Sequence, residues 1–179
     1  MDIEILILAQ LMQGPKHGYE IKKNILFVMN NKKIINNNSL YPKLKQFEER
    51  GMVSKTMEEQ EGRPNRHVYA ITAIGSQVFH DTINRFTPEL IEMDDEWSIR
   101  LAYYNLMNDE TRYRLLDYRM TIVQDKEKRL EKLSHSVGES KYLMYSSELY
   151  FYTQNMIEKE KELISEMIEQ LKDKPATID

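Results

Sequence analysis

Two arginines lie on either side of a proline in a short polar segment of the chain. Residues 62–66 read Gly-Arg-Pro-Asn-Arg, and a glycine and a proline this close together are typical of a tight turn. A guanidinium on such a turn can clamp a phosphate or enter the minor groove of DNA. Arg63, Asn65 and Arg66 are therefore candidate nucleic-acid contacts. For Arg66 the alternative is an ion pair with a carboxylate such as Glu58.

A second group of polar side chains lies at the start of a predicted helix that runs from Ser39 to Arg50 and ends at Gly51. Ser39 is its expected N-cap, and Pro42 falls in its first turn, where a missing N–H costs nothing. Hydroxyl and ammonium groups at a helix N-terminus can bind phosphates or base edges. The candidates at this end are Ser39, Tyr41, Lys43 and Lys45.

Each of these candidates also has a purely structural interpretation. The ring of Tyr41 could pack on the preceding helix, and Lys43 and Lys45 could belong to an ordinary solvated face. Further candidates for phosphate contacts precede this helix, although Tyr19 could equally be a core residue. These further candidates are Tyr19, Lys22, Lys32 and Lys33.

The elements that must position these residues follow from hydrophobic periodicity and from helix and turn signals. Gly14-Pro15 ends a dense apolar first helix, and Thr72 can cap the fourth. In chain order, the predicted elements are helices at residues 3–12, 17–30 and 39–50, strands at 52–58 and 66–72, and a helix at 73–86. Three helices, a β-hairpin wing and a linker helix predict a winged helix-turn-helix domain over residues 1–86.

Thr87-Pro88 marks a predicted domain edge, and residues 87–179 show no strand signal. Helices are expected near residues 94–107, 109–133 and 139–173, so the fold class is mainly α, with an all-α second domain. The last helix repeats apolar residues at spacings of three and four, which predicts one long seam typical of a helix–helix dimer interface. Its members are Tyr142, Tyr145, Leu149, Tyr152, Met156, Leu163 and Met167.

Charge and composition narrow the class of protein. Residues 1–86 contain 12 Lys/Arg against 9 Asp/Glu, a net +3, which leaves −7 for the rest of a chain whose net charge is −4. A weakly basic first domain suits a nucleic-acid partner, although chance could give the same asymmetry. The chain has no cysteine, its four histidines lack metal-ligand spacing, and no catalytic constellation is visible. We therefore expect no metal, no cofactor and no enzyme activity. Without a long apolar stretch or a basic leader, we expect a cytoplasmic protein without a membrane span.

Several segments stand in a recognisable order. The apolar helix ending in Gly14-Pro15 is followed by His17-Gly18-Tyr19-Glu20-Ile21 and by Leu40-Tyr41-Pro42-x-Leu44. Glu48-Glu49-x-Gly51-Met52-Val53 and Glu61-Gly62-Arg63-Pro64-x-Arg66-x-Val68-Tyr69-x-Ile71-Thr72-x-x-Gly75 complete the series. In this order and spacing, residues 3–75 resemble the PadR family of bacterial transcriptional regulators. Beyond Pro88, Asp95-Glu96-Trp97-x-x-Arg100 is similar to the opening of the helical C-terminal domain that longer PadR-type proteins share with virulence activators, with Trp and Arg where Phe and Lys are more usual.

The resemblance implies a homodimer, held largely by its C-terminal helices, that binds a pseudo-palindromic DNA operator and usually represses. Some members of the family lose DNA affinity when a phenolic acid or another aromatic compound binds. Trp97, Tyr103 and Tyr104 are candidates for such an effector site, although the same rings suit an ordinary helix–helix core. The alternatives are an activator of the same fold, or a winged-helix module that binds protein instead of DNA.

Overall fold

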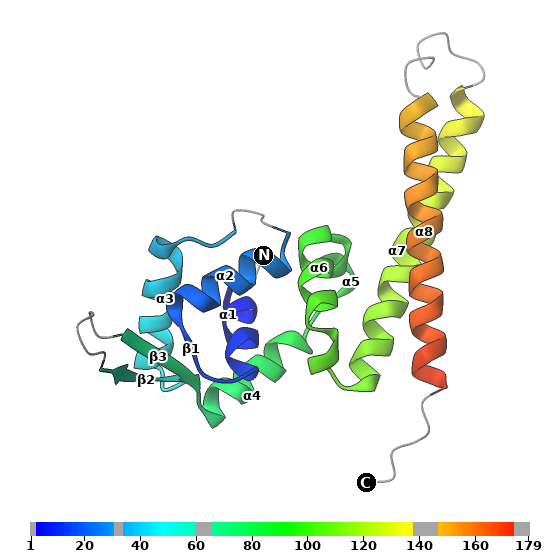
Figure 1. Cartoon of the computed structure of the whole chain (residues 1–179). Coiled ribbons are helices and arrows are strands. Elements are labelled where there is room, and N and C mark those ends of the chain that lie inside the picture. The colour runs from blue at the N-terminus through cyan, green and yellow to red at the C-terminus, as the bar shows by residue number, and fades with distance from the viewer. Residues whose placement is uncertain (1–2, 31–33, 60–65, 138–146, 174–179) are drawn as a thin grey trace. The chain divides into compact units, whose positions relative to one another are not determined.

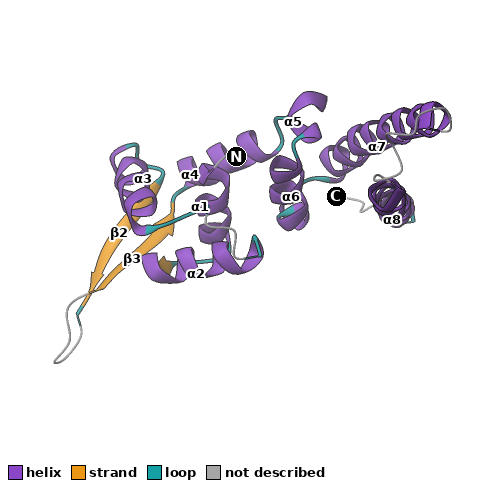
Figure 2. Cartoon of the chain, turned by 90° about the horizontal axis from the view of Figure 1, so that it is seen from above, coloured by secondary structure: helices purple, strands orange, loops and turns teal. Residues whose placement is uncertain are grey.

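The computed structural model describes residues 3–30, 34–59, 66–137 and 147–173. The protein is mainly helical with one small antiparallel sheet (Figures 1 and 2), and it forms two compact units, Met1–Met107 and Asn108–Asp179. The described elements are α1 (Ile3–Met12), β1 (Lys16–His17), α2 (Gly18–Val28), α3 (Asn37–Glu49), β2 (Val53–Glu58), β3 (Arg66–Ile71), α4 (Ala73–Ile83), α5 (Pro88–Glu92), α6 (Asp94–Ala102), the 3₁₀ turn η1 (Tyr104–Leu106), α7 (Asp109–Val137) and α8 (Ser147–Lys172). The order of elements in the first unit confirms the predicted winged helix-turn-helix.

Helix α1 lies in the core of the first unit because it is apolar on all sides. Residues 5–11 are all buried, and α1 packs against α2, α4 and β3. A helix without a polar face has to be surrounded by other elements. Gln10 is the one polar residue in this buried run, and its Nε2 donates a hydrogen bond to Tyr103 Oη at 2.9 Å.

Helix α2 has the predicted position but a narrower buried face than the sequence indicated. Ile21, Ile25 and Met29 are buried. Tyr19, for which the sequence left a core position open, is 51% exposed, and Val28 is 39% exposed. The spacing of apolar residues locates a stripe on a helix but does not tell how far the neighbouring elements extend over it.

Helix α3 begins two residues before the position that the sequence predicted. Its N-cap is Asn36, whose side chain accepts a hydrogen bond from the Ser39 N–H at 3.0 Å, while Ser39 Oγ accepts one from the Asn36 N–H, also at 3.0 Å. Ser39 is therefore the third residue of the helix, and Pro42 lies in its second turn instead of its first. Asparagine caps helices as well as serine does, so residue type alone did not choose between them.

The sheet has the strand order β1-β3-β2 and is antiparallel. The hairpin of β2 and β3 is the predicted wing, and its strands extend away from α1 and α4 in Figure 2. At the end next to its tip, the register pairs Glu58 with Arg66. Strand β1 was not predicted, because its two residues are too few to give a periodic pattern.

The start of the wing is packed closely against the start of α4. Gly51 ends α3 with a φ of +68°, a left-handed conformation that favours glycine. Thr72 caps α4 as predicted, since its Oγ1 accepts a hydrogen bond from the Gly75 N–H at 3.1 Å and donates one to the Gly51 carbonyl at 2.7 Å. A Cβ on Gly75 would lie 2.1 Å from the Met52 carbonyl oxygen, so this close approach requires glycine.

Residues 88–107 pack as part of the first unit, whereas the sequence predicted a domain edge between residues 86 and 87. The helix expected at 94–107 is α6 followed by the turn η1, and the short helix α5 precedes it. The hydrogen bond between Gln10 and Tyr103 ties this segment to α1. A contact across 93 positions leaves no mark in the local sequence, so the Thr-Pro signal could not reveal it.

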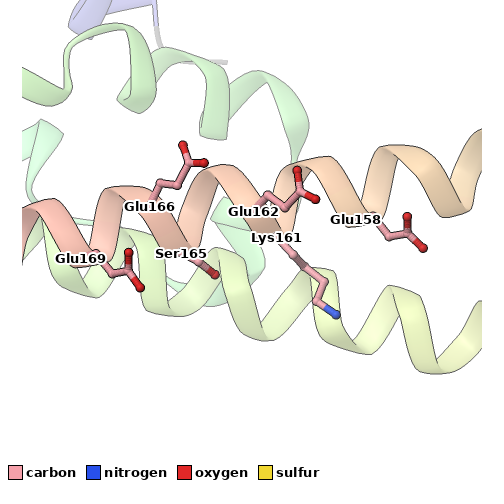
Figure 3. A pocket seen from close by; sticks show the side chains of 6 residues that line it. All are labelled: Glu158, Lys161, Glu162, Ser165, Glu166 and Glu169. Atoms are coloured by element: carbon pink, nitrogen blue, oxygen red, sulfur yellow. The ribbon is translucent and has the colours of Figure 1, made fainter.

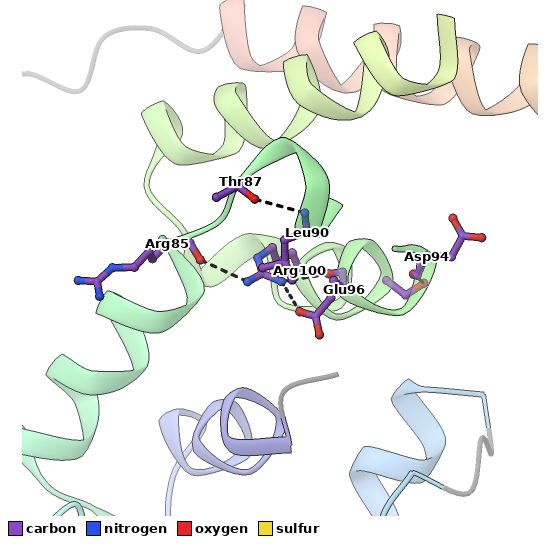
Figure 4. Close-up of polar contacts among 7 residues, drawn as sticks. Arg85, Thr87, Leu90, Asp94, Glu96 and Arg100 are labelled. Carbon is purple, nitrogen blue, oxygen red and sulfur yellow. Dashed lines mark hydrogen bonds and ion pairs between the residues drawn. The ribbon is translucent and has the colours of Figure 1, made fainter. Parts of the chain in front are cut away.

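A buried arginine connects α6 to the end of α4 (Figure 4). Arg100 is 2% exposed, and its Nη1 lies 2.8 Å from Glu96 Oε2. Its Nη2 donates to the Arg85 carbonyl oxygen at 3.4 Å, and its guanidinium carbon lies 5.4 Å from the centre of the Phe86 ring. Burial raises the pKa of Glu96, but interactions that include the hydrogen bond from Arg100 outweigh it and hold the pKa below its usual value.

The second unit consists of two long helices, α7 and α8, which pack side by side in opposite directions (Figure 1). Two ion pairs at 2.6 Å join them, one between Arg119 and Glu160 and one between Lys161 and Glu127. The two predicted helices are confirmed here, although the predicted start of the second at residue 139 lies outside the described residues. No helix in the described parts of the chain is both long and apolar enough to cross a membrane.

Candidate nucleic-acid interface

The first turn of α3 is joined to α2 by a lysine. Lys22 Nζ donates to Asn37 Oδ1 at 2.8 Å, so this candidate for a phosphate contact lies beside the start of the helix that was expected to carry the others. The Ser39 hydroxyl takes part in the cap and donates to the Asn36 carbonyl at 3.1 Å. Asn37 and Asn38 are exposed in this turn. They were not predicted as DNA contacts, because an asparagine-rich stretch is typical of a loop between two helices.

Tyr41 combines the two interpretations that its sequence left open. Its ring lies directly over Gly18, the first residue of α2, where a Cβ would be 2.7 Å from Tyr41 Cε1 and 3.1 Å from Oη. The same side chain is 43% exposed. Tyr41 is therefore packed on the preceding helix and still presents part of its phenol to solvent.

The two lysines of α3 differ in their surroundings. Lys43 Nζ lies 2.8 Å from Glu4 Oε1 and 2.9 Å from Gln46 Oε1, so its charge is directed toward α1. Lys45 has a 76% exposed side chain and makes a looser pair with Glu49 at 3.7 Å. Of the two, Lys45 has the charge that is more accessible to an external partner, while Lys43 would first have to leave Glu4.

The wing strands, at their end next to the tip, contact the start of α2 through a small cluster of aromatic and charged residues. The rings of His17 and Tyr19 are stacked with centres 5.7 Å apart, and the Arg66 guanidinium carbon lies 5.8 Å from the centre of the Tyr19 ring. His17 Nε2 is 3.3 Å from Glu58 Oε2, and its Nδ1 is 3.1 Å from the His67 carbonyl oxygen. Glu58, which the sequence offered as a partner for Arg66, thus contacts His17.

The beginning of α2 connects these two groups of candidates. Gly18 supports Tyr41, Lys22 bonds to Asn37, and Tyr19 lies under Arg66. Residues from α3 and from the wing, which are well separated in sequence, are therefore brought to the same part of the first unit by residues 17–22.

Four predicted contacts lie outside the described residues and stay predictions. They are Lys32, Lys33, Arg63 and Asn65. The structure adds three exposed cations that the sequence analysis did not single out, on α2, at the end of α3 and on β2. They are Lys23, Arg50 and Lys55. Solvent exposure was their only distinguishing property, and a single sequence does not show it.

A buried tyrosine of the wing strand β3 lies near α3. Burial raises the pKa of Tyr69 above its usual value, and the neighbouring Tyr41 and Glu48 add to the shift. In the sheet, Tyr69 pairs with Lys16 on one side and with Lys55 on the other. Tyr69 therefore keeps its phenolic proton at neutral pH and belongs to the packing beneath the candidate interface.

The comparison of sequences with family profiles decides the family. Residues 7–81 match the profile described as the transcriptional regulator PadR-like family. This domain belongs to the PadR-like family. The matched residues include the second part of α1, the helix-turn-helix, the wing and most of α4. No curated protein is similar enough in sequence to count as a match.

Solved structures with likenesses to the whole chain include two of Bacillus subtilis PadR. The complex with operator DNA is 19% identical, aligned over 94% of this chain and 95% of that chain with a TM-score of 0.47. The complex with p-coumaric acid is 18% identical over 94% and 93%, with a TM-score of 0.41. A Streptococcus mutans protein is 24% identical over 93% and 98%, with a TM-score of 0.42. Likenesses at these TM-scores do not support a transfer of residue roles.

The aromatic residues that the sequence offered for an effector site lie just after the PadR-like domain. Trp97 is 6% exposed and Tyr103 is 3% exposed, so both are part of the packed interior of the first unit, while Tyr104 is half-buried. Burial raises the pKa of the Tyr103 phenol, although the hydrogen bond from Gln10 acts in the opposite direction. Packing in the first unit therefore accounts for the burial of Trp97 and Tyr103 without a ligand.

Helix α8 carries a second apolar face that α7 does not cover. Ile157 and Ile164 are its buried residues, whereas most members of the predicted seam are on the exposed side. Leu149, Tyr152, Met156 and Leu163 are 65%, 63%, 54% and 45% exposed. Met167 is half-buried. The residues of the seam before Leu149 lie outside the described residues.

A shallow groove on α8 is strongly acidic (Figure 3). Its lining residues all come from this one helix, and they are Glu158, Lys161, Glu162, Ser165, Glu166 and Glu169. Its one lysine is paired with Glu127. Four carboxylates around an open groove repel anions, so this groove does not suit an aromatic acid. In the described parts of the chain, no group of three or more metal-ligating side chains is present.

Proposed function

We propose that the chain is a homodimeric transcriptional regulator that binds a pseudo-palindromic DNA operator and represses the adjacent gene. In this proposal, residues 1–86 bind DNA and residues 87–179 hold the dimer. The observation that carries it is the convergence of α3, α2 and the wing around residues 17–22. A PadR-like domain with its polar groups gathered there supports DNA as the partner.

The α3 end of this surface would enter the major groove. Winged helix-turn-helix domains insert the N-terminal part of the recognition helix, where exposed amides and the helix dipole favour phosphate. Tyr41, which is packed on Gly18 but partly exposed, would contact base edges or phosphate from a defined position. Lys45 and Lys22 would contact phosphates on either side of it.

The wing would contact the adjacent backbone or minor groove. Arg66 is the first residue of β3. The sequence predicts a turn just before it, and this turn would contain Arg63 and Asn65. Arginine is the preferred side chain for insertion into a narrow minor groove. These contacts would add affinity with little sequence discrimination, whereas Tyr41 would add discrimination.

The second apolar face of α8 would hold the dimer. Four large apolar side chains at spacings of three, four and seven, exposed on one helix, form a seam that a second copy of α8 can cover. A dimer would present two recognition helices, which is the arrangement that a pseudo-palindromic operator requires.

A binding titration with the DNA upstream of the protein's own gene tests this function. If each subunit neutralises about four phosphates, a log–log plot of affinity against salt should have a slope near −7 for the dimer. Tyr41→Ala should reduce the preference for the promoter over a shuffled sequence, and Arg63→Ala or Arg66→Ala should weaken both equally. Lys128→Ala, which removes an exposed cation from α7, is the matched control.

Three outcomes would decide against parts of the proposal. Absence of binding to any duplex would favour a winged-helix module that binds protein. Binding that does not depend on salt would exclude the assigned phosphate contacts. A reporter gene that is more active with the protein than without it would make the protein an activator of the same fold.

A small aromatic effector is the remaining part of the proposal, with Trp97, Tyr103 and Tyr104 as its candidate site. Trp97 is the one tryptophan of the chain, so its fluorescence reports on this segment alone. p-Coumaric acid, present in one of the solved structures above, is a suitable first probe. Saturable quenching together with release of promoter DNA would support an effector, and unchanged fluorescence and DNA binding would count against this compound class.

A further inference from the structure

We propose that His17 and Glu58 are positioning residues for Arg66, because their contact keeps the Glu58 carboxylate away from the guanidinium opposite it on the wing. The proposal rests on the DNA-binding function proposed above, in which Arg66 contacts the DNA backbone. It names the two residues that keep Arg66 available to DNA.

Glu58 and Arg66 are direct cross-strand partners. The register of β2 and β3 places their Cα atoms opposite each other. Directly opposed side chains on antiparallel strands have Cβ atoms about 4.5–5.5 Å apart, a separation at which opposite charges attract. An ion pair between these two would neutralise the arginine that the wing offers to DNA.

The structure shows a different pairing. Glu58 Oε2 lies 3.3 Å from His17 Nε2, and the Arg66 guanidinium carbon lies 5.8 Å from the centre of the Tyr19 ring. An arginine over an aromatic face keeps its charge and its N–H donors available, because the ring attracts the cation without accepting a conventional hydrogen bond. Arg66 is exposed in this position.

His17 has a contact through each of its ring nitrogens. Nδ1 lies 3.1 Å from the His67 carbonyl oxygen, and Nε2 lies 3.3 Å from Glu58 Oε2. The first contact holds the ring beside β3, and the second gives Glu58 a partner other than Arg66.

The other charged groups around His17 agree with this arrangement. From α2, the Glu20 carboxylate accepts the His17 backbone N–H at 2.8 Å, which adds a second negative charge nearby. From β3, Arg66 is separated from His17 by the stacked Tyr19 ring. From β1, Lys16 turns back toward the Gly14 carbonyl oxygen at 3.4 Å.

Loss of the His17 ring would therefore redirect Glu58. Without the ring, Arg66 is the cation that the strand register places opposite the carboxylate. DNA binding should accordingly weaken when His17 is replaced, because Arg66 becomes paired within the wing.

Fluorescence anisotropy of the full chain with a mixed-sequence DNA duplex tests this prediction. His17→Asn should bind about five- to tenfold more weakly than the wild-type protein, because Glu58 is then free to pair with Arg66. Its salt slope should be less negative by about 1.8, as expected when each subunit of a dimer releases one phosphate. Asparagine suits the N-cap position that residue 17 occupies.

Two further variants separate the pairing from a general effect of charge. Glu58→Gln, alone or combined with His17→Asn, should bind as tightly as the wild-type protein, since no carboxylate remains to occupy Arg66. The matched control is Glu59→Gln combined with His17→Asn, which removes the same charge one residue later and should bind as weakly as His17→Asn. The proposal is overturned if His17→Asn binds as tightly as the wild-type protein, or if Glu58→Gln combined with His17→Asn binds as weakly as His17→Asn.

Nuclear magnetic resonance of the free protein distinguishes failure of this proposal from failure of the DNA-binding function. The Arg66 side-chain protons should be shifted upfield by the Tyr19 ring. The upfield shift should disappear in His17→Asn and persist in Glu58→Gln. If no variant binds DNA but these shifts behave as expected, the DNA-binding function has failed and the placement of Arg66 has not. If DNA binds and the shifts ignore His17→Asn, the positioning role is refuted.

Discussion

Replacing Gly18 with alanine tests whether the position of the Tyr41 ring matters for DNA binding. A Cβ at residue 18 would lie 2.7 Å from Tyr41 Cε1 and 3.1 Å from both Cζ and Oη. Carbon atoms pack at separations of about 3.5–4.0 Å, so the ring has to move outward by about 1 Å. Tyr41 is 43% exposed, which gives it room to move without disturbing the core.

The expected effects of Gly18→Ala on folding and on binding differ in size. Alanine is favoured over glycine by about 0.4–1 kcal/mol through the unfolded chain, which offsets part of the weakened ring packing. The free energy of unfolding should therefore change by less than about 1 kcal/mol. A displaced phenol loses a hydrogen bond worth about 1 kcal/mol in each subunit, so a dimer should bind its operator about thirtyfold more weakly.

Urea unfolding and anisotropy with a promoter fragment measure both effects on the same samples. Tyr41→Ala and the double variant Gly18→Ala/Tyr41→Ala should bind DNA equally, because no ring remains to be displaced. Undiminished binding by Gly18→Ala would show that the position of the ring has no influence on recognition. A large loss of stability would show that the ring cannot move away, and the reasoning about its exposure would be wrong.

Four other changes test the packing and the dimer. Gly75→Ala would place a Cβ 2.1 Å from a backbone carbonyl oxygen, so the free energy of unfolding in urea should fall by about 3 kcal/mol, and an unchanged value would contradict the close approach. Arg100→Met should cost about 3–5 kcal/mol in the same measurement, because Glu96 loses its guanidinium partner inside the protein; full stability would refute this. Since the pKa of Glu96 is lowered in the folded state, its contribution to the free energy of unfolding is fully present above about pH 5 and is lost as the pH falls through that lowered pKa. Glu96→Gln should therefore make the free energy of unfolding less dependent on pH below about pH 5. Met156→Glu should shift the dimer toward monomer in sedimentation, unlike the exposed control Asn155→Glu, and equal behaviour of the two would exclude this face of α8.

Local signals predicted the fold of the first unit well. The Gly14-Pro15 break, the Thr72 cap and the two wing strands each depend on signals within a few residues, and each is confirmed. Such signals failed where two nearby residues were equally suited, as with Asn36 and Ser39 at the start of α3. They also failed where the element was too short for a pattern, as with β1.

The candidate site was predicted in composition more than in arrangement. Sequence position correctly placed Tyr41 at the start of a helix, with both a packed and an exposed side. It did not reveal that Lys43 is paired with Glu4, because that partner is 39 residues away. Residue type alone could not distinguish Lys43, which is paired with Glu4, from the more exposed Lys45.

The sequence by itself determined the order of the elements in the first unit and the family of its domain, because these depend on neighbouring residues and on motif spacing. Only the tertiary structure decided the surroundings of Arg66, which the sequence left between DNA and Glu58. The strand register brings Glu58 opposite Arg66, while the approach of β1 gives Glu58 a histidine as a competing partner. Which charge pairs with which is a matter of distances across the fold, and these exist only once the chain has packed.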